Sequence, residues 1–203
     1  MISPTSVNFG TPFIFTTSKQ TITLTNTGSS TITLNSVVLS TADADDWSLS
    51  NQCGSSIGAG KSCTLTLSFT GDEVGTQTAT ITLTDNATNS PQQVGATVNV
   101  IAPAGLLTPI YASFGKVKVG STATQKFVLT SVGLTSLTIN NISISGTGFT
   151  QTNNCPSTLG VYASCTITVT FAPTAKVSYS GTLTVTDNGI IGKQAATFTG
   201  TGN

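Results

Sequence analysis

The sequence contains no histidine and no arginine, and charged residues make up only 7% of it. Seven lysines balance six aspartates and one glutamate, so the formal net charge is zero. Binding to nucleic acid requires clustered cations that displace counterions from the phosphates, and scattered lysines supply no such patch. Most general acid–base catalysis uses histidine. The composition therefore argues against a nucleic-acid-binding protein and against an enzyme, and it indicates no cofactor.

Long apolar runs are also missing, because no stretch approaches the roughly 18 residues of a membrane span. We therefore expect no membrane insertion within this chain. The first residues, Met1 to Pro4, lack the basic start and the apolar stretch of a secretion signal. We expect a mature form, or a piece of a longer chain with Met1 as an added start.

The most informative feature is an internal repeat. Phe9-Gly10 aligns with Phe114-Gly115 at an offset of 105, whereas residues 81–86 align with residues 183–188 at an offset of 102. The change of offset means that the second copy is three residues shorter than the first. The gap falls within the stretch equivalent to residues 41–46, a polar segment typical of a surface loop. The repeat predicts two domains, residues 1–101 and residues 107–203, joined by a short linker at residues 102–106.

Each copy alternates apolar residues with threonine, which occupies 41 positions of the chain. A period of two is typical of strands with one buried and one solvated face. Turn residues separate the strands, and no segment of ten or more residues shows a helical period. The pattern predicts an all-β protein of two tandem immunoglobulin-like antiparallel β-sandwiches, with about seven strands each. The clearest alternating segments are residues 21–25, 64–69, 80–84, 166–170 and 182–186.

Four cysteines occur as two pairs at equivalent places in the two copies. Three pairings are possible, and the duplication favours Cys53–Cys63 and Cys155–Cys165, with reduced buried thiols as the alternative. A zinc site is disfavoured because the spacing is not that of zinc ligands and no histidine is present. Disulfides require an oxidising compartment. We therefore expect an extracellular, cell-surface or periplasmic protein.

A set of short segments recurs in the same order in both copies. These are Phe9-Gly10 and Phe114-Gly115, residues 25–28 and 130–133, and residues 53–64 and 155–166, followed in the second copy by Phe171-Ala172-Pro173 and the terminal residues 198–202. By these segments each copy resembles the ASH-type, Hydin-like immunoglobulin-like domain found in bacterial choice-of-anchor D surface proteins. The first copy departs from the family pattern at Phe69-Thr70-Gly71. The resemblance implies a non-catalytic interaction or spacer module and supplies no catalytic residues.

Two candidate ligand sites remain as hypotheses. Asp43, Asp45 and Asp46 lie in the loop unique to the first copy, and carboxylates at alternate positions are suited to calcium. The alternative is a solvated loop without a metal, and we assign Asp72-Glu73 to a turn. Tyr111, Tyr162 and Tyr179 fall outside the alternating core and are candidates for stacking on a glycan.

The expected function is that of a non-catalytic spacer and adhesion or protein-interaction unit of an exported protein. The main alternative is a self-assembling subunit of an extracellular filament or sheath, because a chain with few charges has little to protect its sheet edges. A glycan-binding module is a further alternative.

Overall fold

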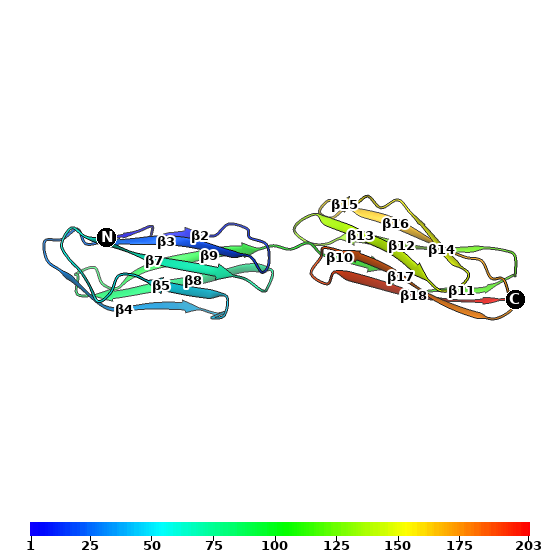
Figure 1. Cartoon of the computed structure of the whole chain (residues 1–203), viewed down its shortest axis with the longest axis horizontal. Helices are drawn as coiled ribbons and strands as arrows, with labels where there is room; N and C mark the ends of the chain where they lie inside the picture. Colours follow the sequence, from blue (N-terminus) through cyan, green and yellow to red (C-terminus); the bar gives the residue numbers. More distant parts are fainter. The chain divides into compact units, whose positions relative to one another are not determined.

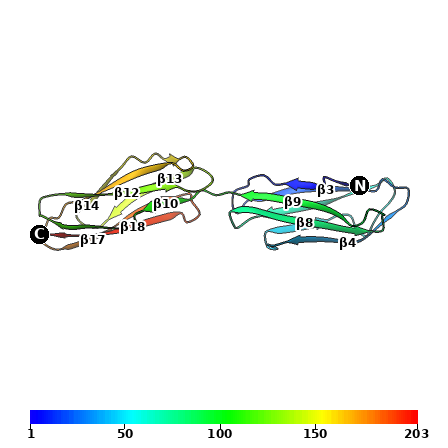
Figure 2. The same cartoon turned by 180° about the vertical axis from the view of Figure 1, so that it is seen from behind.

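The computed structural model describes residues 1–203 and contains strands but no helix. Because the structure contains no helix, it has no helical segment that could cross a membrane. The chain divides into two compact units, Met1–Ile101 and Ala102–Asn203. In each unit two sheets pack face to face, as Figures 1 and 2 show from opposite sides. The predicted class, two tandem immunoglobulin-like sandwiches, is confirmed.

The first unit contains a four-stranded sheet in the order β1-β3-β7-β5 and a five-stranded sheet in the order β2-β9-β8-β4-β6. Neighbouring strands are antiparallel except β2 and β9, which are parallel. The strands are β1 (Ile2–Ser3), β2 (Ser6–Asn8), β3 (Thr17–Thr25), β4 (Ile32–Thr41), β5 (Trp47–Asn51), β6 (Ser56–Ile57), β7 (Ser62–Thr70), β8 (Gly75–Asp85) and β9 (Gln92–Val100).

The second unit repeats this topology, with sheets β10-β12-β16-β14 and β11-β18-β17-β13-β15. Its parallel pair is β11 and β18. Each unit thus has nine strands rather than the predicted seven, because short pairing segments such as β6 and β15 add to the long strands. The strands are β10 (Gly105–Thr108), β11 (Tyr111–Val117), β12 (Ala123–Ser131), β13 (Leu137–Ser145), β14 (Phe149–Asn153), β15 (Thr158–Leu159), β16 (Ser164–Phe171), β17 (Ser178–Asp187) and β18 (Lys193–Gly202).

The register between β3 and β7 shows how the alternating sequence forms a sandwich. Ile22 lies opposite Leu65, and both side chains are fully buried. Their neighbours Thr21 and Thr66 lie opposite one another on the other face of the sheet. Because successive side chains of a strand point to opposite faces, each strand gives its apolar residues to the core and its threonines to the outer face.

Each unit has its own hydrophobic core. Phe9, Trp47 and Phe69 form the aromatic centre of the first, and five phenylalanines form that of the second. Four apolar residues on β4 and β13 are only partly buried and pack against these cores. These residues are Ile32, Leu34, Ile139 and Ile144.

The expected linker, residues 102–106, lies within the second unit. Ala102 is buried, and its carbonyl oxygen accepts a hydrogen bond from the backbone amide of Leu134. The carbonyl oxygen of Ala104 accepts another from Val132, and β10 starts at Gly105. These carbonyl groups pair with Val132 and Leu134, which directly follow β12. The segment is therefore part of the second unit's fold rather than a free connection.

The structure contains two disulfides, Cys53–Cys63 and Cys155–Cys165, and no free cysteine. Cys63 and Cys165 lie near the starts of β7 and β16, which are the equivalent inner strands of the two units. Each bond therefore ties the segment that follows β5 or β14 back to the neighbouring strand of the same sheet.

Candidate functional site

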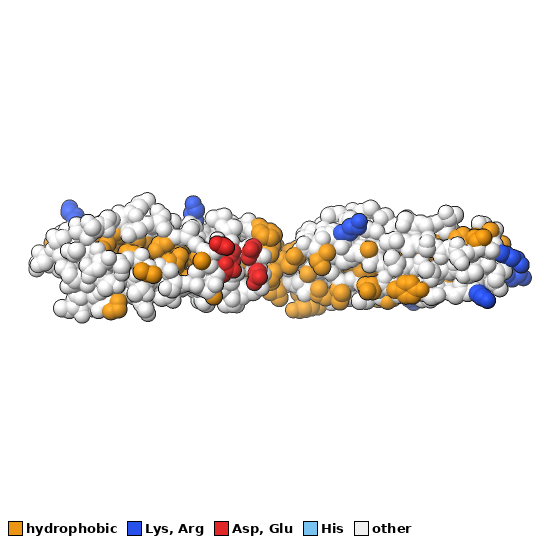
Figure 3. Space-filling view, turned by 90° about the horizontal axis from the view of Figure 1, so that it is seen from below, with side chains coloured by type: hydrophobic (Ala, Val, Ile, Leu, Met, Phe, Trp, Pro, Cys, Tyr) orange, Lys and Arg blue, Asp and Glu red, His pale blue; other side chains and the backbone are white.

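Five of the seven acidic residues lie in two loops at one end of the first unit, where Figure 3 shows a single red group. Asp43, Asp45 and Asp46 belong to the loop between β4 and β5, and Asp72 and Glu73 to the loop between β7 and β8. The two loops are joined because the backbone amide of Thr70 donates a 2.9 Å hydrogen bond to the carbonyl oxygen of Asp46. Like charges are thus brought together in a protein that has few of them.

Three of these carboxylates converge. Asp43, Asp46 and Asp72 each place one carboxylate oxygen within 4.8 Å of the other two. Asp46 is only 6% exposed, and its Oδ2 atom is buried without a hydrogen-bond partner. The sequence-based set of Asp43, Asp45 and Asp46 therefore differs from the observed group. Asp45 stays exposed in the turn, and Asp72 joins the cluster because the β7–β8 loop folds beside it.

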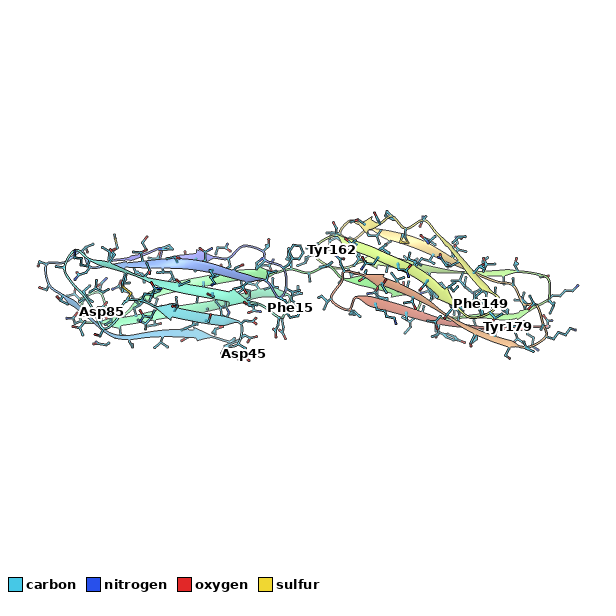
Figure 4. The ribbon with its side chains drawn as sticks, viewed as in Figure 1. Phe15, Asp45, Asp85, Phe149, Tyr162 and Tyr179 are labelled. Atoms are coloured by element: carbon cyan, nitrogen blue, oxygen red, sulfur yellow. A yellow bond between two sulfur atoms is a disulfide. The ribbon has the colours of Figure 1, made fainter.

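The three tyrosines considered for glycan stacking do not form one surface. Tyr162 lies in the loop before β16 and Tyr179 lies near the start of β17, at opposite ends of the second unit in Figure 4. Tyr111 lies on β11, where its hydroxyl is 3.0 Å from that of Thr199. Each ring therefore lies in a separate environment, and a shared stacking site for one sugar chain is not formed.

Tyr179 has a structural role in its loop. Its ring packs edge-on against Phe171 with 5.2 Å between centroids. Its hydroxyl accepts hydrogen bonds from the backbone amides of Ala175 at 2.8 Å and Thr174 at 3.2 Å. The hydrogen bond with the Thr174 side chain is the largest influence that lowers the pKa of Tyr179 below its ordinary value of 10.0. Desolvation opposes this shift in pKa, and the two backbone amides add to it.

Two long edge strands are left without a partner on their outer side. β6 pairs only with Ile32 and Thr33 of β4, and β15 pairs only with Leu137 and Thr138 of β13. The rest of β4 and β13 contains no charged residue and no proline, the residues that usually protect a sheet edge. Each strand carries a bulge near its start, which twists the edge locally. The carbonyl oxygen of Ile142 accepts a 3.5 Å hydrogen bond from the Gln151 side chain, and no further strand of the unit pairs with these two edges.

A polar hollow of about 850 Å³ lies at the end of the first unit that carries the N terminus. It is lined by the turn at residues 26–32 and by residues 86–89. Asn26 is buried there, and its side-chain amide donates hydrogen bonds to the carbonyl oxygens of Ser30 and Ile57. The amide groups of this turn therefore serve the fold, and no aromatic side chain lines the hollow.

Sequence comparison identifies a family for each unit. Residues 1–99 match the HYDIN/CFA65/VesB-like Ig-like domain. Residues 103–195 match the ASH domain, described as abnormal spindle-like microcephaly-associated, ASPM-SPD-2-Hydin. No curated protein matches the sequence.

Solved structures with a similar fold include three of different origin. A Porphyromonas gingivalis W83 protein of unknown function has 12% identity and a TM-score of 0.44, with 99% of this chain and 98% of that chain covered. The ASH/PapD-like domain 7 of human CEP192 has 12% identity and a TM-score of 0.41, with 49% and 84% covered. The secreted serine protease VesC of Vibrio cholerae has 11% identity and a TM-score of 0.40, with 81% of this chain and 45% of VesC covered.

These structural likenesses say nothing about activity. The two family matches together span nearly the whole chain. Immunoglobulin-like domains of the ASH and HYDIN types are typically non-catalytic modules. The equivalent strand orders of the two units agree with a duplication of one such domain. The chain therefore belongs to the ASH-type, Hydin-like immunoglobulin-like domains, of which it carries two in tandem.

Proposed function

We propose that this chain is a non-catalytic spacer and protein-interaction module of an exported or cell-surface protein. The observation that carries the proposal is the parallel pairing of an early strand with the last strand in each unit. In the first unit Val7 lies opposite Ala96, and in the second Tyr111 lies opposite Thr197. With this arrangement the chain enters each unit at one end and leaves it at the other (Figure 1).

Such a unit is suited to transmit tension along a chain. A pull on its two ends loads β2 against β9, or β11 against β18, along the strand direction. Several backbone hydrogen bonds must then break together rather than one after another. Each core and each disulfide lies within its own unit, so one unit can resist or unfold without the other.

The two disulfides support an oxidising compartment. Both cystines close short loops with a sequence separation of 10, and such bonds persist in oxidising surroundings. A count of free thiols in protein purified from its natural source tests this part of the proposal. A count near zero supports export, and four free thiols contradict it.

Single-molecule force spectroscopy tests the spacer role. A chain of about 100 residues extends by roughly 33–36 nm on unfolding, less its folded length. We expect two events, each about 3–4 nm shorter than this while the disulfide is intact and of full length once it is reduced, because the bond joins cysteines with a sequence separation of 10. Unfolding at negligible force, or one merged event, contradicts the proposal.

A second candidate function, self-assembly into a filament or sheath, is favoured by the uncharged edges of β4 and β13. Light scattering after size exclusion separates the two functions, since a spacer stays at the monomer mass of 20.6 kDa. If higher species form, lysine at Val38 or at the equivalent Ser143 should block edge pairing and restore the monomer. A matched control is lysine at Thr66, which lies on the inner strand β7. That variant should leave the assembly unchanged.

A further inference from the structure

We propose that Asp43, Asp46 and Asp72 of the first unit form a calcium-binding site. Their carboxylate oxygens converge to within 4.8 Å of one another from two different loops. Figure 3 shows one group of acidic side chains on the displayed face of the first unit. The proposal rests on this convergence together with the state of Asp46, which is a separate observation.

Asp46 has a buried oxygen without a partner. The residue is 6% exposed, and its Oδ2 atom makes no hydrogen bond. A buried carboxylate oxygen is costly unless it is hydrogen-bonded, paired with a charge or bound to a metal. The first unit has only two lysines, Lys19 and Lys61, and neither belongs to the two acidic loops. A bound cation would supply the missing partner.

The spacing and the ligand type are suited to calcium. Calcium binds oxygen ligands at about 2.3–2.6 Å, so oxygens on opposite sides of the ion are separated by about 4.6–5.2 Å. No two of the three oxygens are more than 4.8 Å apart, so all three can belong to the shell of one calcium ion. Magnesium binds at about 2.0–2.1 Å and requires a nearly ideal octahedron, which three carboxylates on two loops are less suited to provide. Water would complete the calcium shell.

The second unit lacks every part of this site. Asp72 aligns with Thr174 and Asp46 with Gly148, and the second copy has no residue equivalent to Asp43 because of its shorter loop. In the corresponding loop of the second unit, the Tyr179 hydroxyl accepts hydrogen bonds from the backbone amides of Thr174 and Ala175. The second unit therefore closes the corresponding loop by hydrogen bonds within the protein.

The first unit has Gln77 at the position equivalent to Tyr179. The Oε1 atom of Gln77 is buried and has no hydrogen-bond partner. A side-chain amide oxygen is also a calcium ligand in proteins. The unpaired oxygen of Gln77 is thus the second one in the first unit, after that of Asp46. It supports the view that an ion holds the loops of the first unit, whereas Tyr179 holds the corresponding loop of the second unit.

Binding can be followed directly through Trp47, the only tryptophan of the chain, which is next to Asp46 and buried. We expect Ca²⁺ to change its fluorescence with a Kd of about 10⁻⁴–10⁻³ M, the range of extracellular calcium modules. We also expect Ca²⁺ to raise the unfolding temperature of the first unit, because the ion binds only the folded state. EDTA should reverse both effects.

The test uses the full chain and two matched variants. Asp46→Asn should abolish the calcium response while the calcium-free protein folds at least as stably, since a buried unpaired charge is removed. Asp45→Asn, an exposed neighbour outside the group, should respond like the unchanged protein. The proposal is overturned if Ca²⁺ up to about 10 mM, ten times the weaker Kd limit, has no effect on the unchanged chain. It is also overturned by an equal response to Mg²⁺ or by an unchanged response in the Asp46→Asn variant.

Discussion

The ring of Phe9 lies edge-on against the indole of Trp47, with 5.4 Å between the ring centroids and an interplanar angle of 89°. The equivalent pair of the second unit, Phe114 and Phe149, is 5.6 Å apart. Phe9 directly follows β2 and Phe114 lies on β11, so in both units this contact joins an early part of the five-stranded sheet to a strand of the four-stranded sheet. Aromatic contacts therefore close the two sandwiches at the same place although the residues differ.

Replacing Phe9 with alanine should destabilise the first unit by about 3 kcal/mol, at the lower end of the range for a buried phenylalanine. The loss comes from apolar burial and from the cavity left beside Trp47 and Phe69. Trp47 fluorescence during urea unfolding reports the first unit alone, because the second unit has no tryptophan. Phe114→Ala is the matched variant and should leave the Trp47 transition where it is. A shift of that transition in Phe114→Ala would contradict the independence of the two units.

Removing one disulfide should affect only the unit that contains it. Cys53→Ala with Cys63→Ala opens a loop with a sequence separation of 10, and the chain-entropy relation gives about 2.5–3 kcal/mol for a ring of this size. The measurement is the free energy of unfolding from the Trp47 transition in urea. The control is the paired replacement of Cys155 and Cys165, which should leave that transition unchanged. A loss below about 0.5 kcal/mol in the first pair would contradict the expected effect on the unfolded chain.

Tyr179→Phe should loosen the loop at residues 174–175, because two backbone amides lose the hydroxyl that accepts their hydrogen bonds. Faster amide hydrogen exchange at Thr174 and Ala175 measures this change. Tyr111→Phe is the control, since that hydroxyl contacts only the Thr199 side chain. Unchanged exchange at Thr174 and Ala175 would rule out the role of Tyr179 in holding the loop.

The lowered pKa of Tyr179 predicts a pH dependence of stability. In the folded state the phenol loses its proton at a lower pH than in the unfolded chain, whose pKa is the ordinary 10.0. Between the two pKa values the unfolded chain binds more protons, so the free energy of unfolding rises with pH in this window. The difference in stability between the unchanged chain and Tyr179→Phe should therefore grow as the pH approaches 10.0, and well below it should level off at the constant contribution of the hydroxyl's hydrogen bonds. A constant difference across this range would contradict the shift.

Gly200→Ala should destabilise the second unit by about 1–3 kcal/mol, the usual cost of overpacking a core. A methyl group at this position would lie 2.5 Å from Cε1 of Phe171, which is fully buried and cannot move away freely. Gly95→Ala is the matched control, because its added methyl group meets no atom within 4 Å on β9. Thermal unfolding monitored for each unit should show a loss for Gly200→Ala and none for Gly95→Ala.

Most of the fold could be predicted from local patterns. Alternation in segments such as residues 64–69 determines which side chains face the core, and the structure buries Leu65, Leu67 and Phe69 completely. The short strands β6 and β15 were missed because a two-residue segment has no detectable period. The segment at residues 102–106 was expected to be a linker because proline and alanine there resemble a connection, whereas its carbonyl groups pair within the second unit.

Only part of the candidate calcium site could be predicted from the sequence. Asp43 and Asp46 stand out because they lie close together in a loop that is three residues longer than its counterpart in the second copy. Asp72 resembles an ordinary turn residue, and nothing in its neighbours indicates that it approaches Asp46. Its place is decided by the pairing of β5 with β7, which brings the start of one strand beside the end of the other.

The sequence by itself determined the duplication, the all-β class, the division of side chains between core and surface, and the equivalent positions of the cysteines. These properties are periodic or repeated, so they can be recognised without knowing which strands pair. The tertiary structure alone decided the parallel pairing of β2 with β9 and of β11 with β18, the unprotected edges of β4 and β13, and the meeting of Asp72 with Asp43 and Asp46. The physical reason is that strand pairing joins residues far apart in the chain, and it depends on the packing of both sheets rather than on any local segment.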